Sequence, residues 1–117
     1  MGQIWRYIPG SVEGGEEGYE SGILELFIES NDSELIKNAD NLTIAPWGDI
    51  IVCEDRSGDE VRLVGITPQG QFYTFANHHK HTEFAGVCFS PDGTTLFINM
   101  QRAGLTLAIT GPFWKSA

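Results

Sequence analysis

The sequence has few basic residues and no long apolar run, and each shortage excludes a class of protein. Lys and Arg number 7 against 16 Asp and Glu, which gives a net charge of −9 at pH 7. A surface of this charge repels phosphate backbones, so we do not expect nucleic-acid binding. No apolar stretch is long enough to span a membrane. The first residues lack the basic and apolar regions of a signal peptide, and none is expected here.

Cysteine is also scarce, with Cys53 and Cys88 the only two in the chain. Each lies in an apolar, strand-like run, which predicts two buried free thiols. A disulfide between them is the alternative. Neither belongs to a CxxC or Cys/His pattern of the kind that indicates zinc.

Helical periodicity is nearly absent, and its one candidate, residues 33–38, is long enough for a single turn. Short apolar or alternating runs are plentiful instead, and Pro-x-Gly turns separate several of them, as in tight hairpins. The glycine- and glutamate-rich residues 11–21 are too polar to pack and predict a long mobile hairpin loop. The runs predict about nine strands, at residues 4–8, 23–28, 42–45, 50–53, 61–67, 71–75, 85–89, 95–99 and 105–110.

An internal repeat organises these strands. Residues 42–52 have a counterpart in residues 87–97, and each copy is a strand, a Pro-x-Gly turn and a strand. A period of about 45 residues with four short antiparallel strands is typical of a β-propeller blade. The predicted fold is therefore all-β, about two blades of a β-propeller. They comprise a partial blade in residues 1–30, a full blade in 41–76 and a partial blade in 83–113. A small sandwich or barrel with similar hairpins is the alternative.

Two blades cannot close a ring, because propellers need about four to eight. The N-terminal strands of one copy could complete the blade that the C-terminal strands of a neighbouring copy begin. Unpaired sheet edges favour such pairing. We therefore expect a cyclic homo-oligomer, with a trimer as the favoured assembly.

Four stretches of the sequence resemble one protein family. The most specific is residues 83–101, which begins Glu-Phe-Ala-Gly-Val-Cys-Phe-Ser-Pro-Asp-Gly, and residues 40–43, 53–55 and 104–112 support it. Together they resemble the C-terminal part of PhoX-type alkaline phosphatases and their uncharacterised relatives, and the likeness extends over residues 2–113.

The resemblance implies phosphomonoester hydrolysis by a propeller that holds calcium and iron ions at the mouth of its central channel. Members of the family are typically exported to the periplasm and are several times longer than this chain. Most of the ring, and with it most metal ligands, is missing here. A non-catalytic propeller module that self-assembles or binds partners is therefore the alternative function, and whether the isolated chain is an enzyme stays open.

Three carboxylates are the candidate metal ligands. Glu83 immediately precedes a strand and matches a family position where a glutamate contacts metal; the alternative is a glutamate at the rim with no ligand. Glu54 and Asp55 close another strand beside Arg56. Adjacent strand residues point to opposite faces, so at most one of the two faces a given site, and a salt bridge to Arg56 is the alternative role. Carboxylates suit both calcium and iron.

Two basic residues are weaker candidates for contact with phosphate. His79 belongs to a loop with three histidines and a lysine, and Arg102 follows the end of a strand. Either side chain could donate hydrogen bonds to a phosphate oxygen. A solvated loop is the alternative for the histidines.

Overall fold

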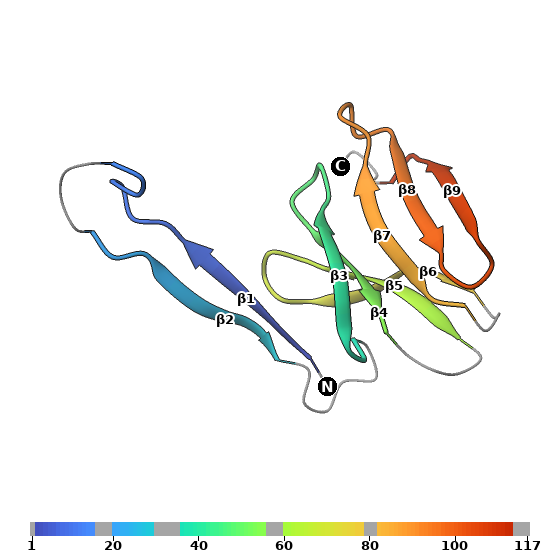
Figure 1. The fold of residues 1–117 in the computed structure, drawn as a ribbon, viewed down its shortest axis with the longest axis horizontal. Helices are drawn as coiled ribbons and strands as arrows, with labels where there is room; N and C mark the ends of the chain where they lie inside the picture. Colours follow the sequence, from blue (N-terminus) through green and yellow to red (C-terminus); the bar gives the residue numbers. More distant parts are fainter. Residues whose placement is uncertain (1, 16–19, 30–35, 56–59, 79–81, 114–117) are drawn as a thin grey trace.

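The chain folds into nine antiparallel strands in three sheets. A computed structural model describes residues 2–15, 20–29, 36–55, 60–78 and 82–113 (Figure 1), and these residues contain no helix. The N-terminal hairpin consists of β1 (Gln3–Ile8) and β2 (Ile23–Glu29). The central sheet has the order β3 (Ala39–Ile44), β4 (Ile50–Glu54), β5 (Val61–Ile66) and β6 (Phe72–His78). The C-terminal sheet has the order β7 (Phe84–Phe89), β8 (Thr95–Met100) and β9 (Leu105–Thr110).

The prediction of an all-β fold is confirmed, and the structure has one sheet of two strands, one of four and one of three. Their arrangement, in which consecutive meanders of antiparallel strands stack face to face, is consistent with blades of a propeller. No helix in the described part of the chain has the length and hydropathy to cross a membrane.

The Pro-x-Gly turns form as predicted because glycine tolerates the backbone that they require. Gly48, Gly70 and Gly93 have φ values of 98°, 83° and 73°, in a region that L side chains seldom adopt. In each turn the glycine N–H donates to the carbonyl three residues earlier, at 2.8–2.9 Å. These turns set the boundaries of the strands on either side.

Asp92 stabilises the last of these turns. Its Oδ1 accepts hydrogen bonds from the Ser90 hydroxyl at 2.6 Å and from the Thr94 amide and hydroxyl at 3.1 and 2.8 Å. These donors, with that of Ser90 first, lower the pKa of Asp92 to about 2. An aspartate that satisfies nearby donors in this way is a common turn-former.

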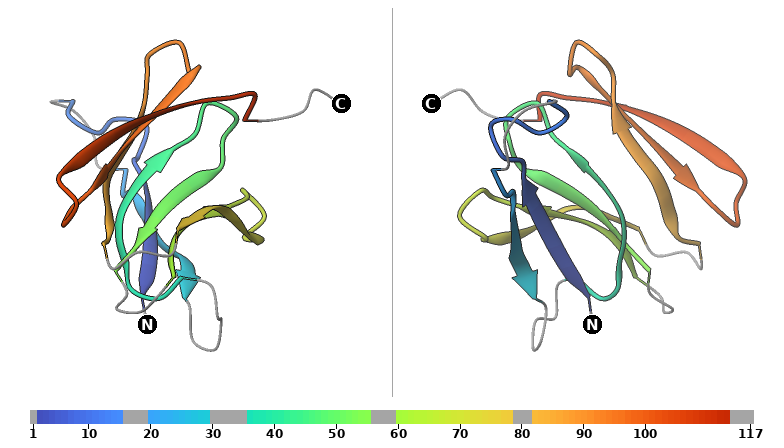
Figure 2. Two further views of the ribbon diagram at one scale, coloured as in Figure 1. Left: turned by 90° about the vertical axis from the view of Figure 1, so that its right-hand side faces the viewer. Right: turned by 60° about the vertical axis from the view of Figure 1, so that its left-hand side comes forward.

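The central sheet is covered on both faces. Successive residues of β4 point to opposite sides, so Ile51 and Cys53 pack towards the C-terminal sheet while Val52 packs towards the hairpin. All six residues of β5 are buried. Figures 1 and 2 show the hairpin and the C-terminal sheet on opposite sides of the central sheet.

Aromatic rings fill the larger of the two cores, between the central and C-terminal sheets. Trp47 stacks on Phe75 and Phe113, with ring centroids 6.3 and 6.0 Å apart, and meets Phe89 edge-on at 5.5 Å. These rings come from both sheets and from the residues after β9, so they join the C-terminal end of the chain to the central sheet. Trp47, Phe75 and Phe89 thus pack between the two sheets.

Two local expectations are wrong. Ile36 and Asn38 have φ values of 60° and 54°, which exclude a right-handed helical turn there; residues 33–35 lie outside the described residues. Both cysteines are free, as expected, but Cys88 is exposed while Cys53 is buried. The apolar run around Cys88 predicts burial, and the structure leaves the face of the sheet that carries Cys88 uncovered.

The loop between β1 and β2 occupies the predicted place, with residues 16–19 outside the described part. Ser11 contacts the carboxylate of Glu20 across the loop through both its amide and its hydroxyl. These hydrogen bonds lower the pKa of Glu20. Glu13 accepts a hydrogen bond from Tyr7 at 2.8 Å, so two of the loop's carboxylates are engaged with the chain itself.

Candidate functional site

The predicted site residues that the structure describes lie at one end of the sheets. Asp55 follows the end of β4, Glu83 precedes β7, and Arg102 follows the end of β8. Because β3 and β7 run in the same direction (Figure 1), the loops that enter these strands lie at the same end of the molecule. We call this end, with residues 36–38, 55, 82–83 and 101–104, the site end. His79 and Arg56 lie outside the described residues.

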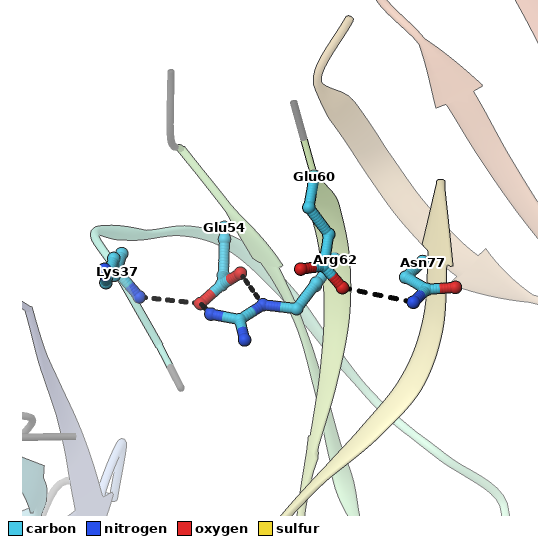
Figure 3. Close-up of polar contacts among 5 residues, drawn as sticks. All are labelled: Lys37, Glu54, Glu60, Arg62 and Asn77. Carbon is cyan, nitrogen blue, oxygen red and sulfur yellow. Dashed lines mark hydrogen bonds and ion pairs between the residues drawn. The ribbon is translucent and has the colours of Figure 1, made fainter. Parts of the chain in front are cut away.

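Glu54 is held inside the protein by an ion pair. Its Oε2 accepts a hydrogen bond from Arg62 Nε at 2.8 Å, and its Oε1 accepts one from an Arg62 terminal nitrogen at 3.0 Å (Figure 3). The backbone amide of Lys37 donates to the same Oε1 at 2.8 Å. The Glu54 side chain has no exposed surface, and 10% of the Arg62 side chain is exposed. Both carboxylate oxygens are therefore engaged by groups of the chain, as a buried charge requires.

The sequence analysis considered Arg56 as the ion-pair partner of Glu54, but the sequence also contains a signal for Arg62. Arg62 stands in the middle of an otherwise apolar strand whose residues are all buried. A charged side chain in such a strand needs an opposite charge beside it. Strand pairing between β4 and β5 brings Glu54 within reach, although the two residues are separated along the chain.

Asp55 is exposed to solvent, unlike the preceding residue Glu54, which is buried. Its backbone is fixed to Asn38: the Asp55 amide donates to the Asn38 carbonyl at 2.8 Å, and Asn38 Nδ2 donates to the Asp55 carbonyl at 3.1 Å. The side chain of Asp55 is exposed at the site end, while that of Glu54 points inward. The two carboxylates thus point in different directions, as expected for adjacent positions on a strand.

Glu83 and Arg102 are brought close by their backbones. The Glu83 carbonyl accepts a hydrogen bond from the Gln101 amide at 2.9 Å. The buried hydroxyl of Thr82 accepts one from the Arg102 amide at 2.9 Å. These bonds place a half-buried carboxylate and an exposed guanidinium on adjoining loops of the site end.

The described residues do not fit a calcium or iron centre by themselves. Among them, no three His, Cys, Asp or Glu side chains lie close enough to hold one ion. Glu54 is engaged with Arg62, and Glu83 and Asp55 come from different sheets. Hard cations such as calcium take six to eight oxygen ligands, which is more than the described part of the site end offers.

A β-bulge at the start of β7 is a feature that the sequence analysis missed. The register with β8 shifts between Ala85 and Cys88, and Gly86 has a φ of 62°. The shift turns the Val87 amide towards the central sheet, where it donates to Asn41 Oδ1 at 3.1 Å. A glycine inside an apolar strand was the available signal, since it often marks a bulge.

Residues 83–87 therefore contain both the carboxylate of Glu83 and the bulge that links the C-terminal sheet to the central sheet. Asn41 lies within β3, not in the loop before a strand. Asn41 and Val87 are far apart in the sequence, so their hydrogen bond ties the central and C-terminal sheets together at a fixed register.

Comparison with known proteins identifies the family. Residues 1–104 match the family described as alkaline phosphatase PhoX. No curated protein and no solved structure gives a significant match. The family match spans all of the hairpin and the central sheet and most of the C-terminal sheet. The chain therefore belongs to the alkaline phosphatase PhoX family.

Proposed function

We propose that this chain contributes to a phosphomonoester hydrolase, as a piece or short relative of a PhoX-type alkaline phosphatase. The observation that carries the proposal is the family match over residues 1–104. It is supported by the positions of Glu83, Asp55 and Arg102, which follow or precede strands of two different sheets at the site end.

Arg102 suits an interaction with the phosphate group. Its side chain is exposed while its backbone is fixed by Thr82. An exposed guanidinium can donate two parallel hydrogen bonds to phosphate oxygens. The proposed role of Arg102 is to orient the ester, with His79 as a second candidate contact.

Calcium and iron belong to the proposal through the family alone. Glu83 and Asp55 offer carboxylates of the right chemistry, but the remaining ligands would have to come from outside the described residues. We therefore derive no reaction step through a metal. Glu54 is the weakest of the three proposed ligands because Arg62 already binds both of its oxygens.

Hydrolysis of p-nitrophenyl phosphate, measured with and without added calcium and iron, tests this function. Glu83→Gln is expected to lower kcat/KM at least about tenfold, and Arg102→Ala to raise KM, as expected for loss of a charge-assisted contact. Glu29→Gln, at the exposed end of β2, is the matched control and is expected to keep full activity. Absence of hydrolysis by the wild-type chain under every metal condition would rule out catalysis by this chain alone.

The second candidate function is a non-catalytic propeller module that self-assembles into a cyclic homo-oligomer, with a trimer favoured. Large apolar side chains exposed on the hairpin, including Trp5, Tyr7 and Leu24, support it. A solution mass from light scattering tests it: a mass equal to that of one chain at all concentrations would exclude this assembly.

A further inference from the structure

A groove runs between the N-terminal hairpin and the first strand of the central sheet. Its wider part, with a volume of about 260 Å³, is lined mainly by apolar side chains of both elements, among them Trp5, Leu42 and Ile44. Its narrower part, about 210 Å³ in volume, lies between residues 3–5 of β1 and residues 39–42 of β3. The two parts share Trp5 and Leu42, and we call them together the β1–β3 groove.

On the groove side, the hairpin covers only part of the central sheet. Strand pairing sets Leu42 beside Val52 and Ile44 beside Ile50, so both side chains point to the same side of the sheet as Val52. The hairpin buries Val52 and its neighbours on β5, whereas Leu42 and Ile44 are 45% and 67% exposed. The apolar surface of β3 therefore continues this core beyond the edge of the hairpin.

The opposite side of the same strands is covered by the next sheet. β7 lies against β3 and β4 (Figure 1), and its Val87 amide donates to Asn41 Oδ1 of β3 at 3.1 Å. Val87 also belongs to the core that contains Ile51 of β4. β3 and β4 thus have a sheet against one side, and the β1–β3 groove lies where an equivalent sheet would cover the other.

The groove is also bordered by a strand edge that has no partner. In the central sheet β5 pairs with β4, and in the C-terminal sheet β9 pairs with β8. In both sheets the preceding strand is the second of a hairpin with a Pro-x-Gly turn. Within the described residues, β1 pairs with β2 alone. Consecutive residues of β1 line the groove, so the unpaired N–H and C=O groups of its free edge border the groove.

We propose that the β1–β3 groove binds an antiparallel β-hairpin of a different polypeptide. One strand of that hairpin pairs with the free edge of β1, and apolar side chains of both its strands cover Leu42 and Ile44. In strand addition of this kind, main-chain hydrogen bonds provide affinity and alternate side chains provide specificity. The packing repeats, on the groove side of β3, the contact that β7 makes on the other side. This inference rests on neither candidate function.

The chain itself shows which kind of hairpin suits the groove. Residues 42–52 and 87–97 are each a strand, a Pro-x-Gly turn and a strand, and the two hairpins lie against each other across the larger core. A folded second copy does not offer either of them, because β4 is already paired with β5 and β8 with β9. The proposed partner is therefore a separate polypeptide with a free hairpin of this pattern.

A peptide taken from the chain provides the probe. A synthetic peptide with the sequence of residues 39–54, which form β3, its turn and β4, is labelled with a fluorophore and titrated with the full chain in reducing buffer. We expect fluorescence anisotropy to show saturable, equimolar binding, and a scrambled peptide of the same composition to show none. Absence of saturable binding at about 1 mM chain, where even millimolar affinity is detected, would overturn the proposal.

Two side chains of equal exposure test the place of binding. Ile44 lines the groove and is 67% exposed, while Leu24 is 66% exposed on β2 and is not among the residues that line the groove. We expect Ile44→Ser to raise the dissociation constant of the peptide about tenfold, through loss of buried apolar area, and Leu24→Ser to leave it unchanged. Circular dichroism establishes that both variants are folded. Equal effects of the two would overturn the assignment of the groove.

Amide hydrogen exchange tests the strand pairing. The peptide is expected to slow exchange in β1 and to leave β9, which also lies at the edge of a sheet, unchanged. Binding without slower exchange in β1 would overturn the proposed strand addition. Sedimentation of the chain without peptide tests the alternative occupant: a dimer that Ile44→Ser abolishes would place a second copy in the groove and overturn the proposal.

Discussion

Glu54 and Arg62 form a buried ion pair whose members depend on each other. Removing one partner from such a pair leaves an uncompensated charge in the protein interior and costs about 3–5 kcal/mol. Glu54→Ala is therefore expected to lower the free energy of unfolding by about that amount, as measured by urea denaturation. The same variant is expected to loosen residues 36–38, because the Lys37 amide loses its acceptor.

Glu60→Ala is the control for this prediction. Glu60 accepts a hydrogen bond from Asn77 at 3.1 Å (Figure 3), and this contact is exposed to solvent. We expect the control to change stability by less than about 0.5 kcal/mol. A comparable loss in both variants would show that the buried pair contributes no more than a surface contact.

Gly86 permits the bulge that joins the sheets. Its φ of 62° disfavours other residues, and a Cβ at this position would stand 2.7 Å from Asn99 Nδ2. Asn99 has little freedom to move, because its Oδ1 accepts a hydrogen bond from Thr106 at 2.7 Å. Gly86→Ala is therefore expected to destabilise the protein by about 1–3 kcal/mol.

Gly104→Ala separates the cost of a positive φ from the cost of crowding against Asn99. Gly104 has a φ of 66° but no neighbour within 4 Å of an added Cβ. Thermal unfolding is measured for both variants. The loss of stability in Gly104→Ala gives the cost of the positive φ alone. The additional loss in Gly86→Ala gives the cost of crowding against Asn99. A larger loss in Gly104→Ala would contradict the role assigned to Asn99.

The buried thiol of Cys53 and the half-buried phenol of Tyr73 predict loss of stability at alkaline pH. Burial raises the pKa of Cys53 from 9.0 to about 12. Burial, followed by the hydrogen bond from Tyr73 to Asp49, raises the pKa of Tyr73 from 10.0 to about 12. The folded state keeps both protons up to a higher pH than the unfolded state does. The free energy of unfolding is therefore expected to fall as pH rises from about 9 to 12.

Tyr73→Phe tests the contribution of the tyrosine. Its ring covers Gly65 on the neighbouring strand, and phenylalanine keeps that packing. We expect a shallower decline in stability above pH 10 than in the wild type, measured by chemical denaturation at a series of pH values. An unchanged slope would mean that the phenol does not titrate differently in the folded state.

At the scale of elements, strand positions were predictable because their turns are local. The Pro-x-Gly signals fix the ends of β4, β5, β7 and β8 to within one residue of the prediction. β3 begins three residues earlier than expected and β6 ends three residues later. Those ends are set by pairing with β4 and β5, which the sequence of one strand does not reveal.

The candidate site was less predictable because its geometry depends on contacts between distant residues. Glu54 pairs with Arg62 across two strands, and the Val87 amide finds Asn41 in another sheet. The exposure of Cys88 follows from the absence of a covering sheet, whereas the apolar run around it predicts burial. By contrast, the position of Glu83 before β7 follows from local sequence and agrees with the prediction.

Amide hydrogen exchange should differ sharply between the hairpin and β5. β5 is buried on both faces, so its amides are expected to exchange only through global unfolding. Ile8 and Ile23, paired at the far end of the hairpin, are exposed and are expected to exchange through local opening. Equal protection of the two elements in a dilute sample would contradict this difference in stability.

At the scale of the whole molecule, the net charge of −9 opposes self-association. Added salt screens the repulsion between copies. Sedimentation equilibrium is therefore expected to give a lower dissociation constant at 0.5 M than at 0.05 M NaCl, and weakening by salt would indicate that ion pairs hold the assembly.

The position of the hairpin at the start of the chain has a consequence for biosynthesis. Ile4 and Ile28 pack with Val52, Val64 and Ile66, all of which leave the ribosome later. The nascent chain therefore carries Ile4 and Ile28 without cover until β4 and β5 have been translated. Exposed apolar strands of this kind are prone to aggregate and to bind chaperones. Slow translation of residues 30–66 is thus expected to lower the yield of soluble protein, even though the finished fold is unchanged.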